Sequence, residues 1–334
     1  MAAYTGIQGQ NILIVSSDPA NPTEGQIWYN TTTNLLKGYQ IATVNAWASG
    51  GNLNTARRLP RGTGTQTSAL TFGGTSGPGP GTSESATEKY NGTSWTSNPT
   101  GLNTARTGMG GAGTQTASLG YGGFIVGGPV TYQSLTESWN GSTWTSLPTQ
   151  NMNTARYQMG SAGTQTSALA FGGDAPPVVT STEEWDGTSW TAGGALNNAR
   201  LGLAGFGTQT AAIGAGGYLP GTKNNVESYN GTSWTAVNTL GTARYGLGGA
   251  GIQTTGVVFG GSVYPGVTRQ TATELWNGTS WTSNPTGLGT ARYSGASSGN
   301  SSEALFSGGY STANVTNTEE WSGTVLTTRT ITTS

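Results

Sequence analysis

Short apolar runs alternate with glycine-rich turns along most of the chain, and this pattern predicts strands rather than helices. The run Ala168-Leu169-Ala170-Phe171 alternates small and large side chains, the period of two expected of a β-strand. It ends in the pair Gly172-Gly173. Asn-Gly pairs between aromatic residues are the strongest short-range signal for a β-hairpin, and they begin at Asn91, Asn140, Asn230 and Asn277. The expected fold class is all-β.

The same pattern recurs six times. A Thr-Ala-Arg or Asn-Ala-Arg tripeptide returns at intervals of about 44–50 residues. After each Arg come a Gly-rich stretch, usually Gly-Thr-Gln-Thr, an apolar run closing in Gly-Gly, a variable segment, an acidic-aromatic turn and Ser-Trp-Thr. The six arginines are Arg57, Arg106, Arg156, Arg200, Arg244 and Arg292. Four strands in each of six copies predict a six-bladed β-propeller, because neighbouring blades bury each other's faces.

The repeats resemble the kelch pattern. The resemblance rests on Gly-Gly at 73–74, 122–123, 172–173, 216–217, 260–261 and 308–309, on aromatic pairs spaced like Trp139 and Trp144, and on an Arg that opens the next unit. It covers residues 46–323 and implies a kelch-type propeller with the Arg strand innermost and the Trp strand outermost. Residues 46–334 are thus expected to form a six-bladed kelch-like propeller. Either the segment ending at Trp47 or the one around Leu326 completes the sixth blade.

The repeated charges and aromatic residues are interpreted as structural. Each Arg has a matching Glu, and equal numbers at fixed spacing favour pairs in which Glu accepts hydrogen bonds from Arg or from backbone amides. A ring of ligand-binding charges is the alternative. The repeated Trp and Tyr are expected to pack between adjacent sheets rather than to form a platform for sugars. The glutamates are Glu88, Glu137, Glu183, Glu227, Glu274 and Glu319.

Composition removes several functional classes. The 334 residues carry a net charge of −1 and include neither Cys nor His. Cys/His metal sites, thiol chemistry and His-based acid–base catalysis therefore lack their side chains, and no cofactor or metal is expected. A charge near zero argues against nucleic-acid binding, and no apolar run approaches about 18 residues, which argues against membrane insertion. With 11 Trp, 13 Tyr and 6 Phe, the chain is not expected to be disordered.

An enzyme is not expected. Some kelch propellers resemble the copper-radical oxidases, but those enzymes need His and a thioether-forming Cys, and this chain has neither. A glycosidase built on two carboxylates stays formally open, because Asp and Glu are present. However, the acidic residues outside the repeated positions show no pairing pattern.

The segments that follow each Gly-Gly differ between copies. Loops on a rigid scaffold commonly carry recognition, and loops rich in Tyr, Gly and Asn suit adaptable polar contacts. The alternative is that the differences are merely tolerated. The candidate receptor-binding residues are Tyr132, Asp174, Tyr218, Lys223, Tyr264, Arg269 and Tyr310.

Residues 1–45 do not repeat and form a predicted N-terminal arm. The segment 18–39 reads as a turn followed by a β-hairpin. It resembles short hairpins of bacteriophage tail-fibre and other virion proteins, in which Gly-Gln-Ile-Trp-Tyr-Asn precedes a Thr/Asn turn and Leu-Lys. Its apolar residues are too few to fold alone, so we expect it to pack on the propeller or on another chain. The candidate docking residues are Ile27, Trp28, Tyr29, Leu35 and Leu36.

Together the resemblances imply a function. The repeats are also similar to kelch-like proteins of phages from aquatic environments. We expect a non-enzymatic virion protein, a tail-fibre or appendage subunit whose propeller loops bind a host-surface glycan or protein. Its arm would dock to other virion proteins, with several copies of the chain in the assembly. The expected location is the extracellular virion, after assembly in the host cytoplasm. The alternative is a capsid or tail decoration subunit with a purely structural role.

Overall fold

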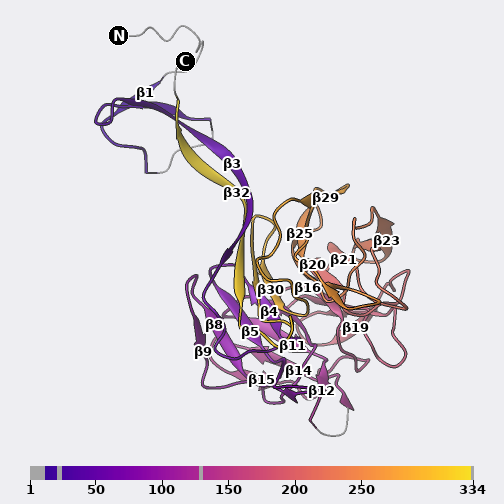
Figure 1. The fold of residues 1–334 in the computed structure, drawn as a ribbon. Helices are drawn as coiled ribbons and strands as arrows, with labels where there is room; N and C mark the ends of the chain where they lie inside the picture. Colours follow the sequence, from indigo (N-terminus) through magenta and orange to yellow (C-terminus); the bar gives the residue numbers. More distant parts are fainter. Residues whose placement is uncertain (1–11, 21–24, 128–130, 332–334) are drawn as a thin grey trace. The chain divides into compact units, whose positions relative to one another are not determined.

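The computed structural model describes residues 12–20, 25–127 and 131–331 (Figure 1). Every regular element in these ranges is a β-strand. Among the described residues there is no helix with the length and apolar character needed to cross a membrane. The chain divides into two compact units, Ala46–Ser322 and a smaller one made of Met1–Asn45 and Gly323–Ser334. The smaller unit thus includes C-terminal residues that the sequence pattern groups with the repeats.

The repeats form six four-stranded sheets with antiparallel pairing. In sheet order, the first five are β4 (Arg61–Gly64), β5 (Ala69–Phe72), β8 (Thr87–Tyr90), β9 (Trp95–Ser97); β10 (Gly110–Gly113), β11 (Ser118–Tyr121), β14 (Thr136–Trp139), β15 (Trp144–Ser146); β16 (Gly160–Gly163), β17 (Ala168–Phe171), β18 (Thr182–Trp185), β19 (Trp190–Gly193); β20 (Ala204–Gly207), β21 (Ala212–Ala215), β22 (Val226–Tyr229), β23 (Trp234–Val237); and β24 (Gly248–Ile252), β25 (Thr255–Phe259), β28 (Thr273–Trp276), β29 (Trp281–Asn284). The sixth consists of β30 (Ala296–Gly299), β31 (Glu303–Ser307), β32 (Thr318–Thr330) and β3 (Leu35–Ser49).

Three of the variable segments contain short two-stranded ribbons. These are β6 (Thr75–Ser76) with β7 (Thr82–Ser83), β12 (Phe124–Ile125) with β13 (Thr131–Tyr132), and β26 (Ser262–Val263) with β27 (Thr268–Arg269). In the smaller unit, β2 (Ile27–Asn30) pairs with β3, and β1 (Leu13–Val15) pairs with β2.

Strand β3, from the N-terminal part of the chain, supplies the outer strand of the sixth sheet. This answers a question that the sequence leaves open. Strand β3 lies next to β32 in that sheet, and Leu326 belongs to β32 itself. Trp47 on β3 occupies the outer Trp position. Its ring centroid lies 4.7 Å from that of Phe259 and 5.5 Å from that of Trp321.

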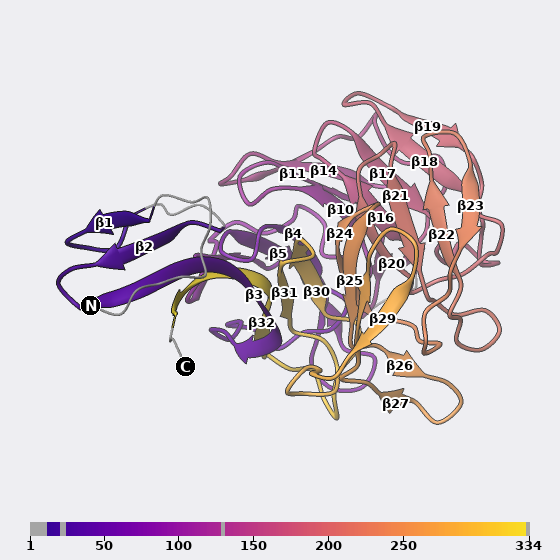
Figure 2. The same ribbon diagram turned by 90° about the horizontal axis from the view of Figure 1, so that it is seen from above.

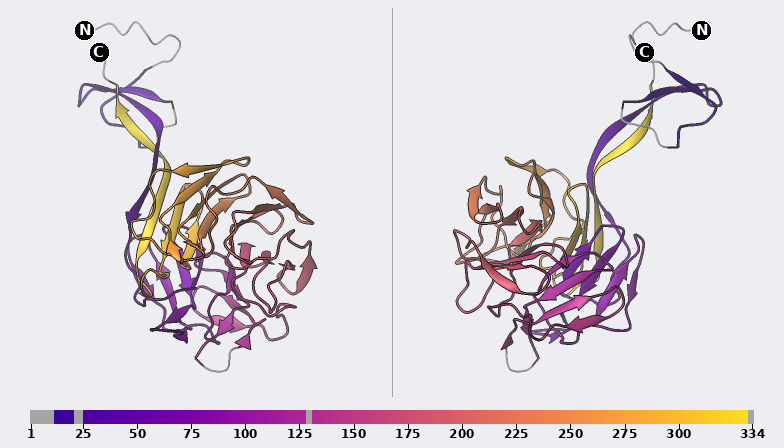
Figure 3. Two further views of the ribbon diagram at one scale, coloured as in Figure 1. Left: turned by 45° about the vertical axis from the view of Figure 1, so that its right-hand side comes forward. Right: turned by 180° about the vertical axis from the view of Figure 1, so that it is seen from behind.

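The first strands of the six sheets lie beside one another. Strand β4 lies beside β10, and the series continues through β16, β20 and β24 to β30, which lies beside β4. Figures 2 and 3 show the sheets of the larger unit following one another in chain order. These first strands are the Gly-rich ones. The repeated Arg lies just before the first strand of its sheet, as Arg106 precedes β10.

A cycle of backbone hydrogen bonds links the turns that follow the six arginines. The residue two positions after each Arg has a φ between 52° and 63°, and its N–H donates to the carbonyl oxygen of the corresponding residue one repeat earlier. The N···O distances are 3.0 Å for Gly108–Leu59, 2.7 Å for Gln158–Gly108, 2.8 Å for Gly202–Gln158, 2.7 Å for Gly246–Gly202, 2.7 Å for Ser294–Gly246 and 2.6 Å for Leu59–Ser294. The last bond joins the first repeat to the sixth. Left-handed backbone is unfavourable for Leu59, Gln158 and Ser294, so the cycle holds them there.

Each sheet contains a buried Arg–Glu pair, which confirms the structural interpretation of the repeated charges. The N···O distance is 2.7 Å in Arg57–Glu88, Arg106–Glu137 and Arg244–Glu274 and 3.1 Å in Arg156–Glu183, and Arg200–Glu227 and Arg292–Glu319 pair in the same way. In the second repeat, Arg106 also donates to the carbonyls of Gly122 and Leu135, and Glu137 accepts the N–H of Asn103. Each pair thus fastens a turn to its sheet.

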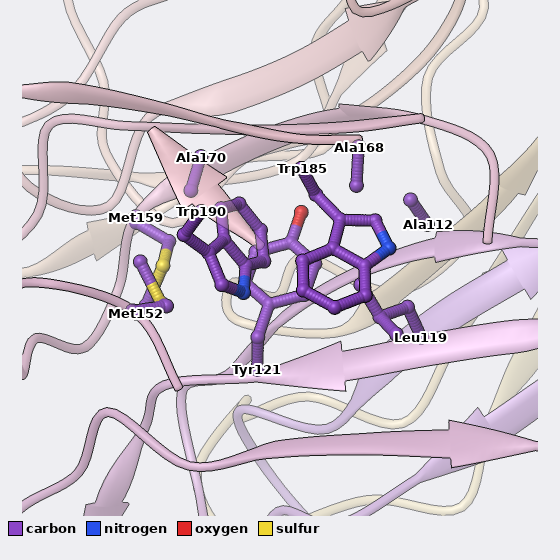
Figure 4. Close-up of a cluster of buried hydrophobic side chains, with 9 residues drawn as sticks. All are labelled: Ala112, Leu119, Tyr121, Met152, Met159, Ala168, Ala170, Trp185 and Trp190. Carbon is purple, nitrogen blue, oxygen red and sulfur yellow. The ribbon is translucent and has the colours of Figure 1, made fainter. Parts of the chain in front are cut away.

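Aromatic side chains fill the space between neighbouring sheets, as the sequence predicts. In the cluster of Figure 4, the ring centroid of Tyr121 on β11 lies 4.7 Å from that of Trp190 on β19, and Trp185 lies beside them. The Tyr121 hydroxyl donates to the carbonyl of Leu169 in the next sheet. Burial of such rings supplies the main apolar contact between sheets.

The glutamine of the Gly-Thr-Gln-Thr segment also joins the sheets, a role that the sequence analysis missed. The Gln115 side-chain amide donates to the carbonyls of Ala69 and Tyr90 in the preceding sheet. Gln66 of the first repeat makes the same contacts with Ala304 and Trp321 of the sixth.

The Asn-Gly hairpins form where the sequence predicts them. Their turns differ from the two-residue turn typical of Asn-Gly, in which both central residues have a positive φ. Asn140 has no positive φ, whereas Gly141 has a φ of 95°. The Asn140 side-chain oxygen instead accepts the N–H groups of Ser142 and Thr143. This contact satisfies backbone donors inside a four-residue loop.

Two sheets have Tyr where the others have Trp, and each of these tyrosines binds a glutamate from the preceding sheet. The Tyr90 hydroxyl donates to Glu320, and the Tyr229 hydroxyl donates to Glu184. Burial, followed by the hydrogen bond to the carboxylate, raises the pKa of both tyrosines to about 12. Burial also raises the pKa of Tyr121 to about 12.

Alkaline pH is therefore expected to destabilise the larger unit. The tyrosine pKa is 10.0 without these effects, so the unfolded chain loses its tyrosine protons before the folded one. The contribution of these tyrosines to the free energy of unfolding should be constant below pH 10 and should fall as the pH rises towards 12. Urea unfolding followed by Trp fluorescence from pH 9 to 12 measures it. Tyr90→Phe with Tyr229→Phe should make the fall shallower, and an unchanged slope would contradict this assignment.

Candidate functional site

The variable segments meet the residues that follow the six arginines. Backbone bridges pair Arg58 with Thr75, Thr107 with Phe124, Tyr157 with Asp174, Leu201 with Tyr218, Tyr245 with Ser262, and Tyr293 with Tyr310. We call the surface made by these residues and the six variable segments the loop face. It is the part of the larger unit where the repeats differ most.

Five tyrosines form a continuous row on the loop face. The ring centroids lie 5.5 Å apart for Tyr264–Tyr218, 5.7 Å for Tyr218–Tyr245, 5.6 Å for Tyr245–Tyr293 and 5.8 Å for Tyr293–Tyr310. Tyr264 is 48% exposed, and the other four are partly buried. We call these residues the tyrosine row. They present aromatic surface together with hydroxyl groups, a combination suited to contacts that are part apolar and part polar.

A second aromatic cluster lies on the third repeat and its neighbour. Phe124 stacks on Tyr157 with centroids 4.9 Å apart, and Tyr132 contacts both rings. The Tyr132 hydroxyl donates to Asp174 Oδ2 at 3.1 Å. Burial and then the Asp174 charge raise the pKa of Tyr132, and the same causes raise that of Tyr157 to about 12. The hydroxyls thus stay protonated as donors.

Two arginines contact the end of the tyrosine row. The guanidinium carbon of Arg58 lies 5.4 Å from the centroid of the Tyr310 ring, and that of Arg269 lies 5.3 Å from it. Such cation–π contacts orient both groups. Within the described ranges neither arginine pairs with a carboxylate. This end of the loop face therefore carries uncompensated positive charge.

The structure brings most of the predicted recognition residues together. Tyr132 contacts Asp174, Tyr218 contacts Tyr264, and Arg269 contacts Tyr310. Lys223 joins none of these groups among the described residues, and its backbone binds Gly217 and Arg244.

The sequence analysis missed four loop-face residues: Arg58, Tyr157, Tyr245 and Tyr293. All four follow a repeated Arg directly. The available signal was the variation at this position, which holds Arg, Thr, Tyr, Leu, Tyr and Tyr in the six copies while the preceding Arg never changes.

Two small cavities lie between the first strands, with volumes of about 70 and 120 Å³. Arg61 lines both, whereas the other sheets have Gly or Ala at the corresponding position. Nothing in the described ranges groups three or more Asp or Glu side chains as a metal site would. Two acids outside the repeated pairs, Glu184 and Glu320, are hydrogen bonded to tyrosines.

The predicted docking residues lie on a β-hairpin in the smaller unit. Strand β2 pairs with β3 in the register Trp28 with Lys37 and Tyr29 with Leu36. Trp28 and Leu36 are buried, and Leu35 is exposed. Asp18 pairs with Lys37 and accepts hydrogen bonds from Trp28 and Asn30. These contacts, with the one from Lys37 the largest, lower the pKa of Asp18 to about 2.

The smaller unit also contains contacts that the sequence analysis did not foresee. The C-terminal segment extends the hairpin, since the N–H of Ile331 donates to the carbonyl of Leu36. On the other side, β1 pairs with β2 in parallel. Strand β1 exposes Leu13 and Ile14, the latter by 71%.

These observations define an all-β repeat protein with six four-stranded units, a buried Arg–Glu pair in each, and an aromatic loop face. Neither a scan against models of known protein families nor a search of curated proteins finds a match to the chain.

Proposed function

We propose that the six units form a closed six-bladed β-propeller of the kelch type. The cycle of backbone hydrogen bonds supports closure, because the bond from Leu59 to Ser294 is equivalent to the other five. The contacts of Gln66 with the sixth sheet repeat those of Gln115 with the first. A ring of this kind leaves only short, protected sheet edges.

We infer that the protein is a non-enzymatic recognition protein that binds its receptor on the loop face. The observation that carries this proposal is the tyrosine row. Aromatic side chains inside the sheets recur in every repeat and pack between neighbours, whereas the row occupies positions that differ between repeats and remains partly exposed. Packing accounts for the aromatic side chains inside the sheets. Recognition of a host-surface glycan or protein accounts for the tyrosine row.

We further propose that the smaller unit attaches the propeller to a phage particle as part of a tail fibre or appendage. The resemblance of the segment 18–39 to tail-fibre hairpins supports this assignment. The exposed Leu13 and Ile14 on β1 supply a surface for a neighbouring virion protein or a second copy of the chain.

Substitution of the exposed end of the tyrosine row should weaken attachment without unfolding the protein. We expect Tyr218→Ala with Tyr264→Ala to weaken binding of the fluorescently labelled full chain to a panel of bacterial cells at least tenfold. The melting temperature should change little. The matched control is Thr191→Ala on β19, an exposed position outside the loop face. Unchanged attachment would contradict the recognition proposal, and a large fall in melting temperature would show that the tyrosines belong to the core.

Gold-labelled antibodies against the full chain test the virion assignment independently. Label at tail tips or fibres supports an appendage. Label over the capsid would indicate a decoration subunit instead of an appendage. Label on cells without particles would contradict both.

A further inference from the structure

A larger cavity opens on the loop face between the first and sixth repeats. Its volume is about 380 Å³, which lies within the range of ligand-binding pockets in proteins. Its lining includes Arg58, Gly77, Tyr310, Thr312 and Asn314. The lining combines a cation, an aromatic ring, an amide and a hydroxyl.

Asn314 presents an unsatisfied hydrogen-bond acceptor. Its Nδ2 donates to the carbonyl oxygens of Thr75 at 3.0 Å and Gly77 at 3.2 Å. These two acceptors fix which end of the amide is the nitrogen. The Oδ1 atom is buried and has no hydrogen-bond partner within the described chain. A buried acceptor left unpaired is unfavourable, and a small shift of the side chain towards the cavity would let a ligand hydroxyl satisfy it.

Arg58 supplies a positive charge that no carboxylate of the described residues pairs with. Its Nη2 donates to the carbonyls of Gly79 at 3.0 Å and Pro80 at 3.4 Å. These contacts hold the guanidinium beside the cavity, and its remaining N–H groups can bind an anion. Among the described residues no Asp or Glu side chain pairs with it. The Nε atom of Arg269, the other arginine on Tyr310, is buried without a partner as well.

We propose that this cavity binds an acidic sugar unit of a surface polysaccharide. Arg58 binds the carboxylate or sulfate group, the Tyr310 ring packs against apolar C–H groups of the sugar, and Thr312 and Asn314 in the lining contact its hydroxyl groups. This inference rests on the proposed recognition function and names its ligand class. The cavity volume suits one sugar unit with its substituent.

Calorimetric titration of the full chain separates the possible ligands. The probes are sialyllactose and a glucuronic acid disaccharide for carboxylates, galactose 6-sulfate for sulfate, and lactose as the neutral reference. We expect the acidic probes to bind at least tenfold more tightly than lactose. The stronger of the carboxylate and sulfate arms identifies the anion. Equal affinity for lactose and the acidic probes, or no binding of any acidic probe, would overturn the proposal.

The repeats themselves provide variants that keep the fold. The position of Arg58 is Thr in the second repeat, and the position of Asn314 is Val in the third. Arg58→Thr should weaken binding of the acidic probe at least tenfold and bring its affinity close to that of lactose. Asn314→Val should weaken binding of the acidic probe and of lactose alike. Thr191→Ala on β19 lies outside the loop face and the cavity lining and should leave probe affinity unchanged.

The outcomes distinguish this site from the general proposal. If no acidic probe binds but attachment to cells still depends on Tyr218 and Tyr264, the acidic-sugar site is wrong and recognition by the loop face stands. If acidic probes bind through Arg58 but cells are not bound, the cavity is a sugar site and the receptor function fails.

Discussion

Replacing Arg106 by Ala should lower the free energy of unfolding by about 3–5 kcal/mol, because it leaves Glu137 buried without its cation. Arg106 is fully buried, and its Nη2 donates to Glu137 at 2.7 Å. The carbonyls of Gly122 and Leu135 lose their donor as well. Urea unfolding followed by Trp fluorescence measures the loss.

Two further variants test the cause. Arg106→Met with Glu137→Leu removes both charges, so it should be less destabilised than Arg106→Ala alone. Glu303→Ala, at an exposed position on β31, should change stability by less than about 0.5 kcal/mol. If the double variant is the less stable one, the penalty does not come from an uncompensated charge.

A Thr residue in one sheet and a Trp in the next form the second contact with a large expected effect. The Nε1 atoms of Trp47, Trp95, Trp144, Trp190 and Trp234 donate to the Oγ1 atoms of Thr273, Thr318, Thr87, Thr136 and Thr182, at distances of 2.9 to 3.1 Å. In the remaining repeat Val226 stands at the Thr position, and the buried Nε1 of Trp281 has no partner in the described structure. The six repeats therefore show this contact both with and without its hydrogen-bond acceptor.

Thr182→Val should lower the free energy of unfolding by about 1–3 kcal/mol, because it leaves the indole N–H of Trp234 buried and unpaired. Val226→Thr should raise it by about 0.5–1.5 kcal/mol by giving Trp281 an acceptor. Both are measured by urea unfolding, and each is the other's control, since the same exchange is made in opposite directions. Changes of the same sign in both variants would contradict this account.

The repeat and its strands could be predicted from the sequence because their signals are local. Alternation in Ala168–Phe171 and the Asn-Gly turns depend on neighbours along the chain, and the predicted strands and hairpins are found there. Equal numbers at fixed spacing predicted that each Glu accepts hydrogen bonds from an Arg or from backbone amides, and the structure contains six Arg–Glu pairs such as Arg57 with Glu88.

Positions within the loop face could be predicted only in part. Variation between copies identified Tyr218, Tyr264 and Tyr310 as candidates, but their contacts join different repeats. Tyr245 and Tyr293 were missed because they follow the repeated Arg, next to residues whose role is structural. The orphan oxygen of Asn314 has no sequence signal, since its neighbours come from the first repeat, more than 200 residues away.

The sequence by itself determined the all-β class, the six repeats and the structural role of the repeated Arg and Glu, because a fixed period repeats the same local contacts. Only the tertiary structure decided that the strand carrying Trp47 completes the sixth sheet, that the C-terminal segment extends the hairpin, and that Leu59 binds Ser294. These contacts join distant parts of the chain. Their choice depends on which backbone groups and apolar faces remain unpaired after the local elements form, and spacing along the chain does not specify that.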